Sequence, residues 1–164
     1  MNVGESLKRH WLQQNVPKDQ LLRGASEAEI TAFEACHNVR LPDDLRQYFL
    51  TVNGIGGSKG AEMDGDLFSF WPISAVKSVA DYYVNAPHFE ESDPASLFIF
   101  ADYCIECHYY AIQLNPDSEQ PTPVYLTTET PKYQFGNSFA DFIELYLANP
   151  DFLINPWREQ KPLK

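Results

Sequence analysis

Cys104-Ile105-Glu106-Cys107-His108 is the densest group of chemically reactive residues in this chain. The spacing matches the C-x-x-C-H pattern of covalent haem attachment, in which both thiols bond to the haem vinyl groups and the histidine ligates iron. Haem attachment of this kind normally follows export. The first ten residues lack the apolar stretch of a signal peptide. We therefore expect no haem and a cytoplasmic protein.

The same cluster raises two other possibilities. Cys104, Cys107 and His108 could bind zinc with a fourth ligand such as His88, but a structural zinc site usually contains a second close pair of ligands, and this sequence has none. A redox Cys-x-x-Cys usually lies at the start of a helix that follows a strand, whereas this one precedes a predicted strand. We predict half-buried side chains on a strand and its turn, with no metal and no cofactor.

Other short motifs do not fit the patterns of phosphate-binding, metal-binding or catalytic sites either. The glycine-rich segment 54–60 does not fit the phosphate-loop pattern and follows a predicted helix instead of a strand. Asp64-Gly65-Asp66 could hold a divalent ion, yet no glutamate lies at EF-hand spacing. Cys36 and His37 are adjacent on a predicted helix, so their side chains diverge by about 100°. Without a nucleophile–base pair or paired carboxylates, we expect the protein not to be an enzyme.

The clearest structural element is a helix over residues 43–52. Pro42 suits the first turn, and Asp43 and Asp44 place negative charge at the positive end of the helix dipole. Asn53-Gly54 is expected to end the helix, because both residues tolerate the left-handed conformation. The expected apolar face comprises Leu45, Tyr48, Phe49 and Val52.

The remaining pattern predicts helices first, strands next and a helix last. Helices are expected at about 5–14, 26–37 and 138–148, with a short helix within 73–84, and strands at about 67–71, 97–101, 107–114 and 124–127. This order predicts an α+β fold with a mainly antiparallel sheet flanked by helices. We expect a single domain over 1–164, with its core at about 24–148.

Several of these segments occur in the order that is typical of one family. They read E-I-x-A-F-E, L-P-x-D-L-x-x-Y, F-x-F-x-P-I, F-I-F-A-D and S-F-x-D-F-I-x-L-Y-L, over roughly residues 24–148. The set resembles the SUKH superfamily, which includes the fungal cell-wall assembly regulator Smi/Knr and many bacterial immunity proteins. Family members often have a glycine-rich turn between the two later strands, where this chain has Asp102-Tyr103-Cys104-Ile105-Glu106.

Charge is distributed unevenly along the chain. The formal net charge is −11, and no Lys or Arg occurs between Lys77 and Lys132. Such an acidic stretch repels nucleic acid and anionic membranes, and it attracts a basic protein. Acidity that serves only solubility is the alternative. The chain also lacks an apolar run as long as the roughly 18 residues of a membrane span.

The resemblance implies a protein-binding module, namely an immunity protein that neutralises a basic toxin, often a nuclease. A regulatory or scaffold domain is the alternative. Adjacent tyrosines at 82–83 and 109–110 should each place one ring outward on a strand, where exposed tyrosine suits an interface. The predicted partner-facing acids are Asp64, Asp66, Glu90, Glu91, Asp93, Asp102 and Glu106.

Overall fold

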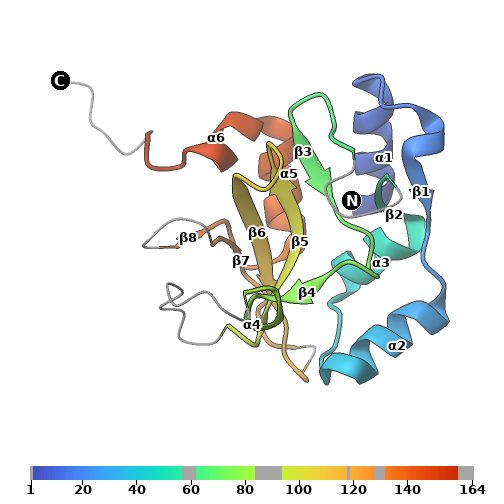
Figure 1. The fold of residues 1–164 in the computed structure, drawn as a ribbon, viewed down its shortest axis with the longest axis vertical. Coiled ribbons are helices and arrows are strands. Elements are labelled where there is room, and N and C mark those ends of the chain that lie inside the picture. Colours follow the sequence, from blue (N-terminus) through green and yellow to red (C-terminus); the bar gives the residue numbers. More distant parts are fainter. Residues whose placement is uncertain (1, 57–61, 84–93, 118, 128–131, 159–164) are drawn as a thin grey trace.

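The protein is built around an antiparallel sheet with helices beside it (Figure 1). The computed structural model describes residues 2–56, 62–83, 94–117, 119–127 and 132–158. The sheet has the order β3-β5-β6-β7-β8, and β4 also pairs with β5. Its strands are β3 (Phe68–Phe70), β4 (Lys77–Ser78), β5 (Leu97–Tyr103), β6 (His108–Gln113), β7 (Val124–Leu126) and β8 (Tyr133–Gln134). The predicted α+β class is confirmed.

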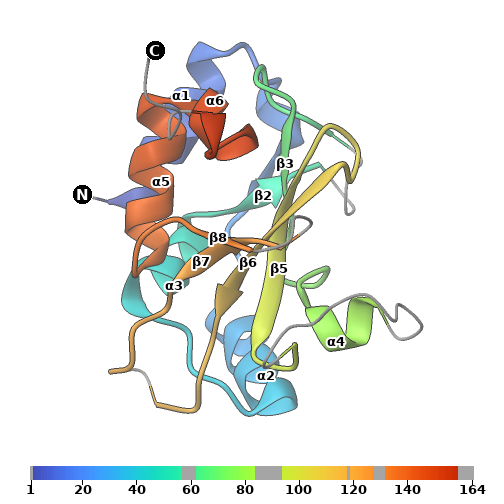
Figure 2. The same cartoon turned by 90° about the vertical axis from the view of Figure 1, so that its left-hand side faces the viewer.

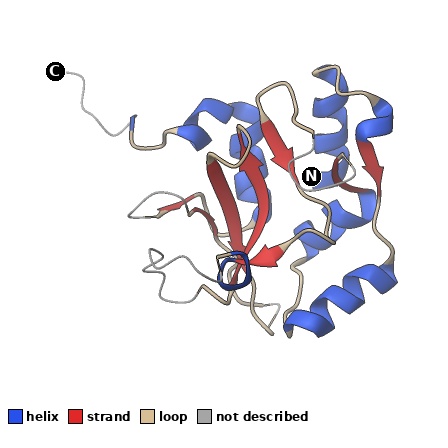
Figure 3. Ribbon diagram, viewed as in Figure 1, coloured by secondary structure: helices blue, strands red, loops and turns tan. Residues whose placement is uncertain are grey.

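The helices lie on both sides of this sheet. They are α1 (Val3–Gln13), α2 (Glu27–His37), α3 (Asp43–Thr51), α4 (Val79–Tyr82), α5 (Phe139–Ala148) and α6 (Pro150–Ile154). Figure 2 shows α1, α3 and α5 on one side of the sheet and α4 on the other. A short 3-10 helix, η1 (Lys18–Gln20), leads into a second, two-stranded sheet of β1 (Leu21–Arg23) and β2 (Val52–Ile55) (Figure 3).

Local capping signals fix where the helices begin. The Ser26 hydroxyl accepts a hydrogen bond from the Glu29 amide (3.1 Å), and the Glu29 carboxylate accepts one from the Ser26 amide (2.7 Å). This reciprocal pair is a capping box at the start of α2. At the start of α5, the Ser138 hydroxyl likewise accepts from the Asp141 amide (3.1 Å). These bonds satisfy amides that have no partner within the helix.

The prediction that Asn53-Gly54 ends a helix through a left-handed cap was wrong. Helix α3 ends at Thr51, and Val52 is already extended, with φ −150°. Asn53 and Gly54 lie inside β2. Gly54 does adopt a positive φ of 87°, but its role is close packing, because an added Cβ would collide with the Phe70 carbonyl oxygen. Glycine is needed here where two strands approach each other.

Both faces of the central strands β5 and β6 are buried. The face on the side of α1, α3 and α5 packs against α1, where Val3, Leu7 and Trp11 are all buried. A second apolar cluster lies on the other face and contains Trp71, Val79, Leu97, Ile99, Tyr109 and Ala111. Tyr109 and Tyr110 are therefore only 7% and 0% exposed. The prediction that one of these tyrosines faces solvent was wrong, because it assumed a sheet with one hydrated face.

A buried hydrogen-bond chain connects three distant segments of the core. The Trp11 indole N–H of α1 donates to the Tyr146 hydroxyl of α5 over 3.0 Å. The Tyr146 hydroxyl in turn donates to the Asp64 carboxylate, which precedes β3. Each polar atom in this chain is thus satisfied inside an aromatic core. Tyr48, in contrast, is buried with a hydroxyl that has no hydrogen-bond partner among the described residues.

Replacing the two buried tyrosines should therefore have opposite effects. Tyr146→Phe leaves the Trp11 indole without an acceptor and removes a donor from Asp64, so we expect the free energy of unfolding to fall by about 1–3 kcal/mol. Tyr48→Phe removes only an unsatisfied hydroxyl, so stability should stay equal or rise slightly. Urea denaturation of both variants checks this. Equal losses of unfolding free energy in the two variants would contradict the assigned hydrogen bonds of Tyr146.

Candidate protein interface

Two turns lie side by side at one end of the main sheet. Residues 64–67 form a turn before β3, and residues 104–107 connect β5 to β6. Phe68 pairs with Tyr103 across the sheet, and the Cys104 amide donates to the Leu67 carbonyl oxygen over 2.9 Å. We call these two segments the paired turns. They bring together parts of the chain that are almost forty positions apart in the sequence.

Asp64 organises the first of the paired turns from inside the protein. The residue is 5% exposed. One carboxylate oxygen accepts from the amides of Asp66 (2.8 Å) and Phe68 (3.0 Å), and the other accepts from Tyr146. Burial raises the pKa of Asp64, and the hydrogen bond from Tyr146 opposes that rise. The bonds of Asp64 therefore build the turn and anchor it to α5.

Asp102 has the same role in the second turn. It is 0% exposed. One carboxylate oxygen accepts from the Trp71 indole N–H over 2.6 Å, and the other accepts from the Glu106 amide over 2.9 Å. The first bond joins the carboxylate to the segment after β3, and the second folds the hairpin back on itself. A buried carboxylate is stable only when such donors surround it.

The paired turns keep their backbone in an unfavourable conformation. Leu67, Cys104, Ile105 and Glu106 have φ values of 69°, 50°, 54° and 65°. The left-handed region costs an L-residue roughly 1–2 kcal/mol, and it is rare for a β-branched residue such as Ile105. The second turn is closed by the Cys107 amide, which donates to the Tyr103 carbonyl oxygen over 2.9 Å. The surrounding hydrogen bonds maintain this strain.

The paired turns hold aliphatic side chains in solvent. Ile105 is 69% exposed and Leu67 is 42% exposed. Acidic groups flank them: the Asp66 side chain is 37% exposed, and the half-buried Glu106 accepts from the Tyr82 hydroxyl over 2.9 Å. Tyr82 also shares a hydrogen bond with the Tyr109 hydroxyl (3.1 Å). The result is an aliphatic patch with an acidic and aromatic border.

The seven acids predicted to face a partner divide into three groups. Asp66 and Glu106 reach the surface of the paired turns. The prediction was wrong for Asp64 and Asp102, because their carboxylates are buried and accept hydrogen bonds from amide, indole and hydroxyl donors. The others lie outside the described residues: Glu90, Glu91 and Asp93. The sequence did not predict a role for Leu67 and Ile105. Leucine and isoleucine are normally expected in the core, and only the backbone conformation shows that these two side chains lie in solvent.

Comparison with protein families assigns the fold. The model of the SMI1/KNR4 family (SUKH-1) matches residues 24–145. The chain belongs to this family. The SUKH-1 match runs from the residue after β1 into α5 and includes both of the paired turns. In the comparison with curated proteins, no sequence matches this chain.

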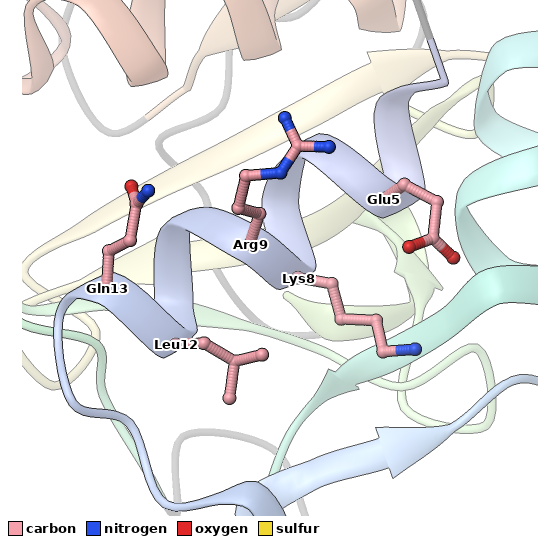
Figure 4. Close-up of a pocket in the computed structure, with 5 residues that line it drawn as sticks. All are labelled: Glu5, Lys8, Arg9, Leu12 and Gln13. Atoms are coloured by element: carbon pink, nitrogen blue, oxygen red, sulfur yellow. The ribbon is translucent and has the colours of Figure 1, made fainter.

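A second, basic surface lies largely outside the SUKH-1 match. Figure 4 shows the outer side of α1, where a surface pocket of about 430 Å³ is lined by Glu5, Lys8, Arg9, Leu12 and Gln13. A neighbouring pocket of about 390 Å³ shares Lys8 and Leu12 and adds Lys18 and Arg23 from η1 and β1. Four cations, Lys8, Arg9, Lys18 and Arg23, thus lie on segments distinct from the acidic stretch.

Among the described residues, the cysteine–histidine cluster forms no group of metal ligands, and His88, the fourth ligand considered for zinc, lies outside those residues. The His108 ring stacks on the Tyr103 ring, with centroids 5.9 Å apart. Partial desolvation and the neighbouring Cys104 raise the pKa of the exposed Cys107 thiol. Across the part of the chain that the structure describes, no three His, Cys, Asp or Glu residues lie close enough to hold a metal ion. Within the same residues, no helix has the length and apolar character needed to cross a bilayer.

Asp102→Asn should weaken the fold through the second of the paired turns. Asparagine offers one oxygen, so its amide group would face either the Trp71 indole or the Glu106 amide, both of which are donors. One donor would be left unsatisfied, and we expect the free energy of unfolding to fall by about 1–3 kcal/mol. The control is Glu144→Gln on the exposed side of α5, which should change stability by less than about 0.5 kcal/mol.

Thermal and urea unfolding of both variants test this assignment. If Asp102→Asn were as stable as the Glu144 control, the buried carboxylate would not be what organises the turn.

Proposed function

We propose that this SUKH-1 protein is a non-enzymatic protein-binding module, an immunity protein that neutralises a toxin. The observation that supports it most strongly is the strained backbone that keeps Ile105 and Leu67 in solvent. Backbone strain of this kind concentrates at functional sites. An exposed aliphatic patch with a polar border is also the usual composition of a protein interface.

Charge indicates the class of partner. The paired turns carry Asp66 and Glu106, and Asp81 is exposed at α4. The stretch between Lys77 and Lys132 contains no cation in its sequence. Such a surface attracts a basic protein and accelerates its association. Nuclease toxins are usually basic proteins, so an acidic inhibitor can cover the active site of such a toxin by imitating phosphate charge. This step rests on the family and on charge, because fold alone does not define function.

The absence of catalysis is part of the same proposal. The buried carboxylates of Asp64 and Asp102 accept hydrogen bonds from turn amides, an indole and a hydroxyl. These bonds position the turns, which is a structural role and not that of a paired acid and base. The protein would then act by occupying its partner's surface.

A regulatory or scaffold protein with more than one partner is the second candidate. It is favoured by the basic pockets on α1 and β1, whose charge is opposite to that of the paired turns. Two surfaces of opposite charge could hold two different proteins. An immunity protein needs only one of them.

A growth assay distinguishes these candidates. We expect a gene beside that of this chain to encode a toxin domain whose expression stops growth, and we expect co-expression of this chain to restore it. Ile105→Asn should lose protection, since asparagine tolerates the left-handed backbone and removes the aliphatic contact. Leu12→Asn, at another exposed leucine, should still protect. Growth arrest that this chain leaves unrelieved would rule out immunity to that toxin and favour the scaffold.

Association kinetics with the same toxin domain test the role of charge. Glu106→Gln keeps the acceptor for Tyr82, so it should mainly slow association, whereas the Glu144→Gln control should not. Raising salt from about 0.05 to about 0.5 M shortens the screening length from roughly 14 to roughly 4 Å, which should also slow association. An on-rate that neither change affects would mean that the acidity serves only solubility.

A further inference from the structure

Cys104 and Cys107 lie at the two ends of the second of the paired turns. The residues from Cys104 to Glu106 all have positive φ, so the segment is one turn of left-handed helix. The Cys107 amide closes it by donating to the Tyr103 carbonyl oxygen over 2.9 Å. The two thiols lie within hydrogen-bond reach of each other across this turn. A disulfide has an S–S bond of only about 2.05 Å, so a small tightening of the turn is needed to form it.

The two thiols are free and reach solvent. Cys107 is exposed and Cys104 is half-buried. They also interact with each other. Partial desolvation is the largest cause of the raised pKa of Cys107, and the charge of Cys104 and a hydrogen bond with its side chain raise that pKa further. A raised pKa reduces the fraction of thiolate at neutral pH, and the thiolate is the reactive form. The pair should therefore react slowly with disulfides at neutral pH and faster as the pH rises.

We propose that Cys104 and Cys107 are a redox modification site that closes an intrachain disulfide across the turn carrying Ile105 and Glu106. The oxidant is a small disulfide such as oxidised glutathione. The Cys107 thiolate attacks one of its sulfurs, which forms a mixed disulfide and releases one glutathione thiolate. The Cys104 thiolate then attacks the Cys107 sulfur and releases the second. The protein loses two electrons and two protons, and two glutathione thiols form.

The modification would regulate the candidate interface, a consequence that rests on the proposed function. The bond draws Cys104 and Cys107 together, so the two residues between them must move. Ile105 and Glu106 are the aliphatic and acidic groups expected to meet the partner. The oxidised protein should associate more slowly with the toxin domain, and reduction should restore the rate.

The chemical step is tested on the protein alone. The full chain is incubated with reduced and oxidised glutathione in varied ratios, from about pH 7 to about pH 9, then alkylated and measured by intact mass. We expect the wild type and Cys36→Ser to lose two hydrogens and two alkylation sites, faster at higher pH. Cys36 is exposed on α2 and serves as the internal control. Cys104→Ser should instead retain a glutathione adduct at Cys107.

Two results would overturn the disulfide. One is a wild-type protein that retains the glutathione adduct at Cys107, and the other is a disulfide between two chains. If the intrachain bond forms and the on-rate with the toxin domain is unchanged, the modification stands and its regulatory role is wrong. If neither the oxidised nor the reduced protein binds the toxin domain, the proposed function fails, and the mass result for the disulfide is unaffected.

Discussion

The interaction on which this surface depends is the satisfaction of two buried carboxylates by turn amides and aromatic donors. Asp102 has no exposed surface, and Asp64 is nearly as buried. A buried charge without partners costs several kcal/mol, so the Trp71 indole, the Glu106 amide and the Tyr146 hydroxyl must hold their positions. Because these donors are fixed, the backbone of the paired turns has little conformational freedom. The positive φ values in the turns are a consequence of that restriction.

This arrangement suits binding because it removes flexibility before a partner arrives. Side chains that are ordered in advance lose less entropy on association. Ile105 and Leu67 extend from turns that are anchored to the core through Asp102 and Asp64, and Asp66 and Glu106 lie beside them. The family match includes these turns but little of the basic surface of α1 and β1. The two surfaces therefore differ both in charge and in their relation to the SUKH-1 family.

Much of the fold could be predicted from local signals, whereas much of the site could not. The Ser26–Glu29 capping box and the apolar run of β5 define their elements within a few residues, and the structure confirms both. The Asn53-Gly54 pair led to a wrong prediction of a helix end, because Gly54 is instead needed where two strands pack too closely for a Cβ atom. Nothing in Asp64-Gly65-Asp66 reveals which carboxylate turns inward. That choice is made by Tyr146, more than eighty positions away, through a contact that only the folded chain creates.

The central claim, that the second turn stores backbone strain, is tested most directly by urea denaturation of Ile105→Gly and Ile105→Ala. Both variants remove the exposed side chain, and only glycine removes the penalty for a positive φ at this position. The left-handed penalty of roughly 1–2 kcal/mol exceeds the entropy that glycine adds to the unfolded chain, about 0.5–1 kcal/mol. We expect Ile105→Gly to be more stable than Ile105→Ala by about 0.5–1 kcal/mol. A glycine variant as stable as the alanine variant, or less stable, would show that the turn is not strained.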